Sequence, residues 1–267
     1  MNEIFIYVLA IAAKRYGVLV HAVCVLSNHV HLILTDVDGR LPAFMQYLDS
    51  LVARAVNVSL GRFEAFWATD GSYSAVEPLD PADVLAKTAY VLANPVAAGL
   101  VRRGSEWPGL WTAPEQIGVE TLSARRPRVF FDPASHLPET VELELSVPPS
   151  FAATEFRSLL AEAVRELEQA HARERTAQGR GFLGVVRVLA ENPLASPPTR
   201  PARFELKPRI AARDKWKRIE GILRIKDFER DYRRARRDML SGVRDVIFPA
   251  GTYLLRILFG VRCAGAA

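Results

Sequence analysis

Apolar residues recur at two different periods along the first sixty residues, and the change of period separates helices from strands. Asn2–Tyr16 is apolar on most turns and is followed by a glycine, which indicates a buried helix. Val18–Leu26 and His29–Thr35 are apolar, β-branched runs joined by two residues, the pattern of a tight hairpin. Leu41–Leu60 returns to helical spacing and stops at Gly61.

Weaker extended pieces and another helix follow. Phe63–Trp67 and Tyr73–Val76 are short candidates for strands. The next helix is expected to start at Asp80, a favourable N-cap, because Pro81 suits the first helical position. It is expected to end at Asn94, because a following proline cannot continue a helix.

The second strand of the hairpin carries two histidines that are two residues apart. Side chains alternate along a strand, so His29 and His31 project from one face, and Val30 and Leu32 project from the other. Two imidazoles on a rigid strand can chelate one divalent cation. The alternative is a hydrogen-bonded polar pair on a half-exposed strand, which is common for so short a motif.

The expected third helix supplies a second pair of polar groups. Tyr90 and Asn94 are four residues apart and therefore share one helix face. A phenol close to a metal-bound phosphate can act as a nucleophile, and an amide oxygen one turn away can complete the coordination of the metal.

With His29-Val30-His31 followed by Tyr90-x-x-x-Asn-Pro-Val-x-Ala-Gly-Leu-Val, the chain resembles the HUH single-tyrosine transposases, in particular the branch associated with repetitive extragenic palindromes. The resemblance extends from Asn2 to Leu110. It implies an α+β fold with a ferredoxin-like antiparallel sheet and flanking helices. It also implies transposition by cleavage and transfer of single-stranded DNA at hairpin or palindromic sequences, through a 5′-phosphotyrosine intermediate.

The resemblance assigns roles to the four residues. Tyr90 would be the catalytic nucleophile, and His29, His31 and Asn94 would hold Mg²⁺ or Mn²⁺. The partner would be single-stranded or hairpin DNA. The chain departs from the family at Asn94, where glutamine is frequent, and at two further positions: Ser27 replaces a proline and Ala98 replaces a basic residue.

The expected order of elements lacks the strand with which a ferredoxin-like sheet begins, and its loss would leave unpaired backbone groups. A coding sequence that starts upstream of Met1, or a decaying copy of a mobile element, would each account for this. The second explanation gives the alternative function, a domesticated or truncated remnant that binds DNA without cleavage. A phosphodiesterase that uses water would need a general base, for which the sequence offers no candidate.

The chain is divided into a catalytic domain (1–112), an irregular connector (113–150) and a mainly helical, basic region (151–267). Proline and turn residues from Arg125 to Pro149 indicate the connector, and Thr154–Gln178 has helical spacing. Asn192–Pro201 is expected to be a second linker. Lys207–Arg237 is the most basic segment, and is either a solvated helix face or a contact for DNA phosphates. Its aromatic residues are expected to pack rather than to stack on bases.

Composition is compatible with these expectations. The chain has 267 residues and a net charge of +5, which suits a polyanionic partner. Its two cysteines favour a reducing compartment, and Cys24 is expected in the core. No stretch has the charge order of a signal peptide or the length of a membrane span, so a cytoplasmic protein is expected. The sequence leaves open whether two chains form a homodimer.

Overall fold

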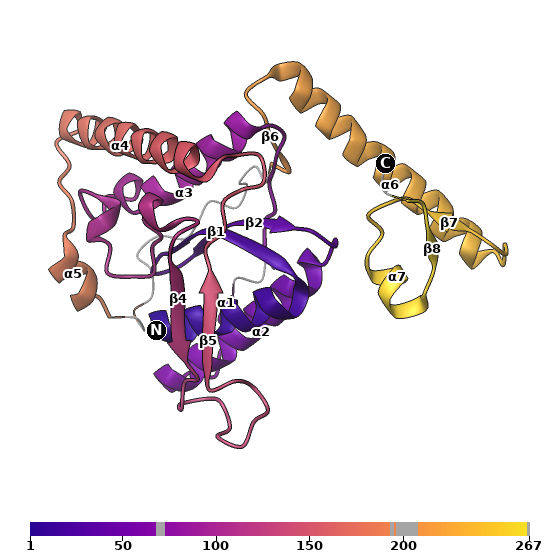
Figure 1. Ribbon diagram of the computed structural model, residues 1–267, viewed down its shortest axis with the longest axis horizontal. Coiled ribbons are helices and arrows are strands. Elements are labelled where there is room, and N and C mark those ends of the chain that lie inside the picture. Colours follow the sequence, from indigo (N-terminus) through magenta and orange to yellow (C-terminus); the bar gives the residue numbers. More distant parts are fainter. Residues whose placement is uncertain (68–72, 193–194, 196–207, 266–267) are drawn as a thin grey trace.

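A two-stranded antiparallel sheet lies between two layers of helices in the computed structural model, which describes residues 1–67, 73–192, 195 and 208–265 (Figure 1). The expected α+β class, a small antiparallel sheet flanked by helices with a helical region after it, is confirmed. The elements of this core are α1 (Asn2–Tyr16), β1 (Val18–Val25), β2 (Val30–Asp36), α2 (Leu41–Leu60), α3 (Pro81–Ala97) and α4 (Ala153–Ala177).

A bulge in strand β1 changes which of its residues face each layer of helices. The register with β2 shifts between Val20 and Ala22. Val20 packs in the cluster formed with α1 and α2, whereas Ala22 and Cys24 pack in the cluster formed with α3 and α4. Because Cys24 pairs directly with His31 across the sheet, His31 also lies on the α3 side.

Helix α3 begins as expected and ends later than expected. Asp80 is its N-cap and accepts a hydrogen bond from the Asp83 N–H. Pro95 lies inside the helix, which continues to Ala97, so the predicted end at Asn94 is wrong. A proline in the last turn removes one N–H, and the helix closes instead through the Ala98 N–H, which donates to the Asn94 carbonyl at 2.9 Å.

The predicted irregular connector contains a second hairpin. β4 (Thr121–Arg125) and β5 (Thr140–Glu144) pair antiparallel, and their apolar residues join the cluster around α1. The prediction of an irregular segment from Arg125 to Pro149 is therefore wrong for β5. Alternation in Thr140–Glu144, where Val141 and Leu143 are buried between exposed residues, was the missed signal.

The two edges of the central sheet differ. The outer edge of β1 accepts hydrogen bonds from the Thr112 and Ser146 N–H groups and donates one to the Leu110 carbonyl. Alternate residues of β2 turn their backbone groups away from β1. Within the described residues these groups have no backbone partner.

The expected extended pieces after α2 are not strands. Phe63–Trp67 and the described part of the next piece, from Tyr73 to Val76, are irregular, and residues 68–72 lie outside the described residues. The strand in this region is β3 (Glu77–Pro78), which pairs in parallel with β6 (Ile210–Ala211) from the C-terminal region. The short pairing reflects a contact between distant segments that no local pattern encodes.

The C-terminal region is mainly helical, and α6 extends from the core at one side (Figure 1). On α6, Phe228 and Tyr232 stack at 6.0 Å between ring centroids, as expected for packing residues. Trp216 is 74% exposed, so the expectation that it packs is wrong. Most of the expected linker Asn192–Pro201 lies outside the described residues. The remaining elements are the 3₁₀ helices Gly104–Glu106 and Pro114–Gln116, α5 (Val185–Ala190), α6 (Lys215–Leu240), β7 (Ile247–Phe248), α7 (Leu254–Phe259) and β8 (Arg262–Cys263).

Among the described residues, no helix combines the length and the apolar composition that crossing a membrane requires.

The apolar contact of α3 with the sheet predicts a measurable difference between two leucines. Leu92 on α3 is fully buried, whereas Leu159 on α4 is 39% exposed. We expect Leu92→Ala to lower the free energy of unfolding by about 2–5 kcal/mol because it leaves a cavity. Leu159→Ala should cost less than about 1 kcal/mol. Urea unfolding of both variants measures the difference, and equal losses would contradict the assigned packing.

Candidate functional site

The hairpin places His29 and His31 side by side on the face of the sheet that α3 covers. His31 lies in β2, whereas His29 lies in the turn just before it, so the strand begins one residue later than expected. The carbonyl of His29 accepts a hydrogen bond from the Leu26 N–H at 2.9 Å, which holds the turn in the strand geometry. The two imidazole centroids are 4.8 Å apart and the rings are nearly perpendicular.

Helix α3 brings the other two expected residues to the same place. Asn94 Nδ2 donates a hydrogen bond to His31 Nε2 at 3.0 Å. The Tyr90 and His31 ring centroids are 6.2 Å apart. Tyr90 and Asn94 therefore face the hairpin together, and all four expected site residues meet although about sixty residues separate the strand from the helix in the sequence.

The hydrogen bonds of the two histidines indicate which ring nitrogen carries the lone pair. His29 Nδ1 donates to Asn28 Oδ1 at 2.7 Å, so its lone pair is on Nε2. His31 accepts the Asn94 bond on Nε2, so its lone pair is on that nitrogen too. The lone pairs that a cation would need are thus on Nε2 of both rings.

Both imidazoles are held neutral. Burial and then the neighbouring His29 lower the pKa of His31 to about 4. Loss of surrounding water also lowers the pKa of His29, against a smaller opposing effect of its hydrogen bond with Asn94. Because a protonated imidazole cannot bind a metal, these shifts keep the pair competent for coordination at neutral pH.

The donor set fits a divalent cation that prefers nitrogen and oxygen. Two imidazoles come from the hairpin, and a half-turn of the Asn94 amide would present Oδ1 where Nδ2 now lies. Cys24 pairs with His31 on the same face, but burial raises the pKa of its thiol to about 12, which makes it a core residue as expected. Among the described residues, no group of three or more His, Cys, Asp or Glu side chains is arranged so that it could hold a metal ion.

Tyr90 differs from Tyr47 and Tyr73 in its exposure and its neighbours. It is 50% exposed and lies beside the histidines, with the Lys87 ammonium 5.4 Å from its ring centroid. Tyr47 packs against the ring of Tyr16 at 5.8 Å. Tyr73 is 39% exposed, and partial burial raises the pKa of its phenol. Tyr90 is therefore the tyrosine that combines access to solvent with a neighbouring imidazole.

Two neighbours of the site were not singled out from the sequence. Asn28, which bonds His29, lies in the turn that the pattern already located, and its adjacency was an available signal. Lys87 is three residues before Tyr90, so helix periodicity places it on the same face. His21 is structural: it is buried, and its ring nitrogens bond Ser146 O and Thr35 Oγ1, each at 2.8 Å.

Comparisons with known proteins add no relative to this description: no protein-family model, no curated protein and no solved structure matches the chain.

The lowered pKa of His31 predicts a pH dependence of stability. In the unfolded chain a histidine takes up a proton below about pH 6.5, whereas folded His31 stays neutral down to about pH 4. Stability should therefore fall as the pH drops through this window, by about 1–3 kcal/mol. His31→Gln, which does not titrate, should remove this part of the slope in urea unfolding at pH 7 and 4.5.

The difference between the variant and the native chain isolates His31 from Asp49, whose pKa burial raises to about 6 and whose effect on the slope is opposite. The matched control is His136→Gln, because His136 is exposed on a loop. An unchanged slope in His31→Gln would show that His31 charges freely in the folded protein.

Proposed function

We propose that the chain cleaves and rejoins single-stranded DNA through Tyr90, with His29, His31 and Asn94 as the metal-binding residues. The observation that carries this proposal is the assembly of Tyr90, His31 and Asn94 across two distant elements, with Asn94 Nδ2 3.0 Å from His31 Nε2. A structural histidine pair would not need an exposed phenol one helical turn from its amide partner. The sequence resemblance to the HUH single-tyrosine transposases supports the same function.

The reaction exchanges one phosphodiester bond for another. Tyr90 Oη attacks the scissile phosphorus in line with the departing 3′ oxygen. The Oη–P bond forms, the P–O3′ bond breaks, and the proton lost by the phenol is balanced by the one that the 3′ oxygen gains. Because bond types are conserved, a second 3′-hydroxyl can reverse the step and join strands without a high-energy cofactor.

Each residue of the site would have a separate role in the reaction. A divalent cation such as Mg²⁺ or Mn²⁺, when bound by His29, His31 and Asn94, supplies positive charge to the non-bridging phosphate oxygens. Helix α3 holds the phenol on a rigid element, which favours a fixed angle of attack. Lys87, 5.4 Å from the Tyr90 ring centroid, adds a positive charge where the phosphate would approach.

A second function is favoured by one observation, the far edge of β2, whose backbone groups have no partner within the described residues. An incomplete sheet would position the two histidines less rigidly than catalysis requires. Under this alternative the chain binds a DNA hairpin as a remnant of such an enzyme and forms no covalent bond with it.

We expect the native chain to form a covalent adduct with DNA. Hairpin oligonucleotides with single-stranded flanks, taken from the DNA on either side of the coding sequence and labelled at the 3′ end, would be incubated with Mn²⁺ or Mg²⁺. A labelled band that survives denaturation should appear on a gel, should disappear with EDTA, and should be absent for Tyr90→Phe. Hairpin binding by Tyr90→Phe should be unchanged, because the variant lacks only a hydroxyl group.

Tyr73→Phe is the matched control and should form the adduct normally. An adduct that persists in Tyr90→Phe and is lost in Tyr73→Phe would overturn the assignment of the nucleophile. Hairpin binding without an adduct in any chain would favour the remnant.

A further inference from the structure

A segment from the C-terminal region lies against the face of α3 that carries Tyr90. Residues 210–213 and the first turn of α6 form one wall of a pocket of about 290 Å³, and α3 forms the other wall. The side chains that matter for its chemistry are Asp83, Lys87, Tyr90, Arg213 and Arg218. The catalytic tyrosine proposed above thus shares a pocket with two arginines that are more than 120 residues away in the sequence.

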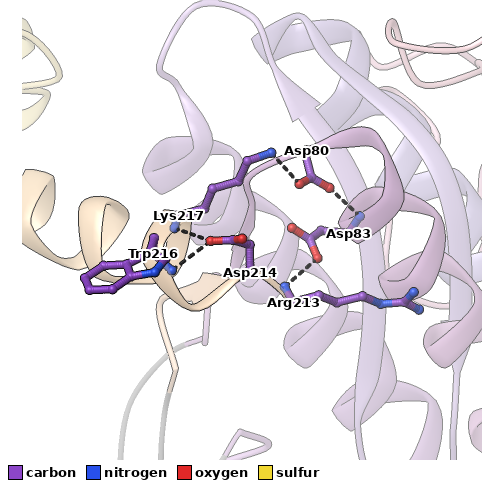
Figure 2. A network of polar contacts seen from close by, with 6 residues as sticks. All are labelled: Asp80, Asp83, Arg213, Asp214, Trp216 and Lys217. Atoms are coloured by element: carbon purple, nitrogen blue, oxygen red, sulfur yellow. Dashed lines mark hydrogen bonds and ion pairs between the residues drawn. The ribbon is translucent and has the colours of Figure 1, made fainter.

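Polar contacts fix this wall at the start of α3 (Figure 2). The Arg213 N–H donates to Asp83 Oδ1 at 2.9 Å, and the Lys217 ammonium donates to Asp80 Oδ2 at 2.9 Å. Asp214 caps α6, because its Oδ1 accepts hydrogen bonds from the N–H groups of Trp216 and Lys217. Each of these contacts uses a group whose position is set by a helix start, so the wall is held in register with α3.

Apolar packing supports the same placement. Gly221 of α6 lies so close to Leu79 and Ile210 that an added Cβ would come within 3.0 and 3.1 Å of their terminal carbons. Ile210 is buried and belongs to β6, which pairs with β3. A larger residue at position 221 would push α6 away from Leu79 and Ile210.

The pocket has an excess of positive charge. Within the described residues the Arg213 guanidinium has no ion-pair or hydrogen-bond partner, and Figure 2 shows it pointing away from the three carboxylates nearby. Arg218 uses one N–H on the Ala212 carbonyl at 3.2 Å, and Lys87 contacts the Tyr90 ring. The one carboxylate that lines the pocket, Asp83, is buried and accepts the Arg213 N–H, so three cations face one anion.

We infer that this pocket binds a phosphate of the DNA strand next to the one that Tyr90 attacks, with Arg213 and Arg218 as its ligands. An unpaired guanidinium offers two parallel N–H donors, the geometry that a phosphate accepts. The volume suits one sugar-phosphate unit rather than a longer stretch. Contacts to phosphate position a strand without selecting its sequence.

The inference assigns the contact with DNA phosphates to particular residues of the basic segment Lys207–Arg237. Further along α6, two arginines are paired with acids of the same helix: Arg230 with Asp227, and Arg233 with Glu229. Those charges are satisfied within the protein. The arginines at the start of α6 differ because they reach the pocket of Tyr90.

The inference rests on the proposed function in one respect: it takes the bound phosphate to belong to the DNA strand that Tyr90 cleaves. Binding is therefore tested apart from cleavage. The probe is a fluorescent (dT)12 oligonucleotide, and anisotropy is measured on full-length protein in EDTA, which prevents metal-dependent chemistry. We expect Arg213→Ala to weaken binding about five- to tenfold, because one charge-assisted hydrogen-bonding group is removed. The slope of log affinity against log salt concentration should become shallower by about 0.7 for each phosphate that the variant no longer neutralises.

Arg236→Ala is the matched control, because Arg236 is exposed on the far part of α6 and its removal changes net charge equally. It should bind as the native chain does, and equal weakening of both variants would overturn the inference in favour of a general charge effect. Arg213→Lys should recover part of the affinity. Folding is checked by urea unfolding, which Arg213→Ala should leave unchanged because its backbone N–H still bonds Asp83.

A neutral methylphosphonate at single positions of a cleavable hairpin separates this inference from the proposed function. A methylphosphonate at one position next to the scissile phosphate should weaken binding of the hairpin by the native chain. The same substitution should not weaken binding by Arg213→Ala any further. Absence of this coupling while the Tyr90 adduct still forms would overturn the pocket alone. Coupling without any adduct would support the pocket and overturn the proposed cleavage.

Discussion

The hydrogen bond between Asn94 and His31 joins the helix to the hairpin, and the geometry of the site depends on it. Asn94 is 8% exposed, so its amide must be satisfied within the protein, and His31 Nε2 lies 3.0 Å away to accept from it. A buried amide left without a partner costs about 1–3 kcal/mol. The bond holds Asn94 against the hairpin, and Tyr90, one turn earlier on the same face of α3, lies beside the same imidazole.

The bulge in β1 decides on which face of the sheet His31 lies. It shifts the alternation so that Ala22 and Cys24 pack under α3, and His31 lies on their side because it pairs with Cys24. Without the bulge, Ala22 and Cys24 would lie on the same side as Val18 and Val20, and Val23 would face α3 instead. The placement of His31 next to α3 therefore depends on this irregularity.

Local pattern was sufficient for the parts of the fold whose signal is periodic. The bounds of α1 and α2 and the hairpin between them follow from helix spacing and β-branched runs, and the shared face of His29 and His31 follows from strand geometry. The continuation of α3 through Pro95 to Ala97 could not be predicted, because burial of the last turn of α3 outweighs the single N–H that the proline lacks. The pairing of β3 with β6 and the approach of Arg213 to Tyr90 depend on contacts between segments more than 120 residues apart, for which one sequence carries no signal.

The central claim is that Tyr90 becomes covalently attached to DNA, and peptide mapping tests it most directly. After reaction with a hairpin oligonucleotide and Mn²⁺, the DNA would be trimmed by nuclease and the protein digested with trypsin. Cleavage after Lys87 and Arg102 releases residues 88–102, which contain Tyr90 as their single tyrosine, whereas Tyr73 falls in the preceding peptide. We predict a mass increase of one or a few nucleotides on the peptide 88–102. A nucleotide on the preceding peptide, or no modified peptide at all, would contradict the account.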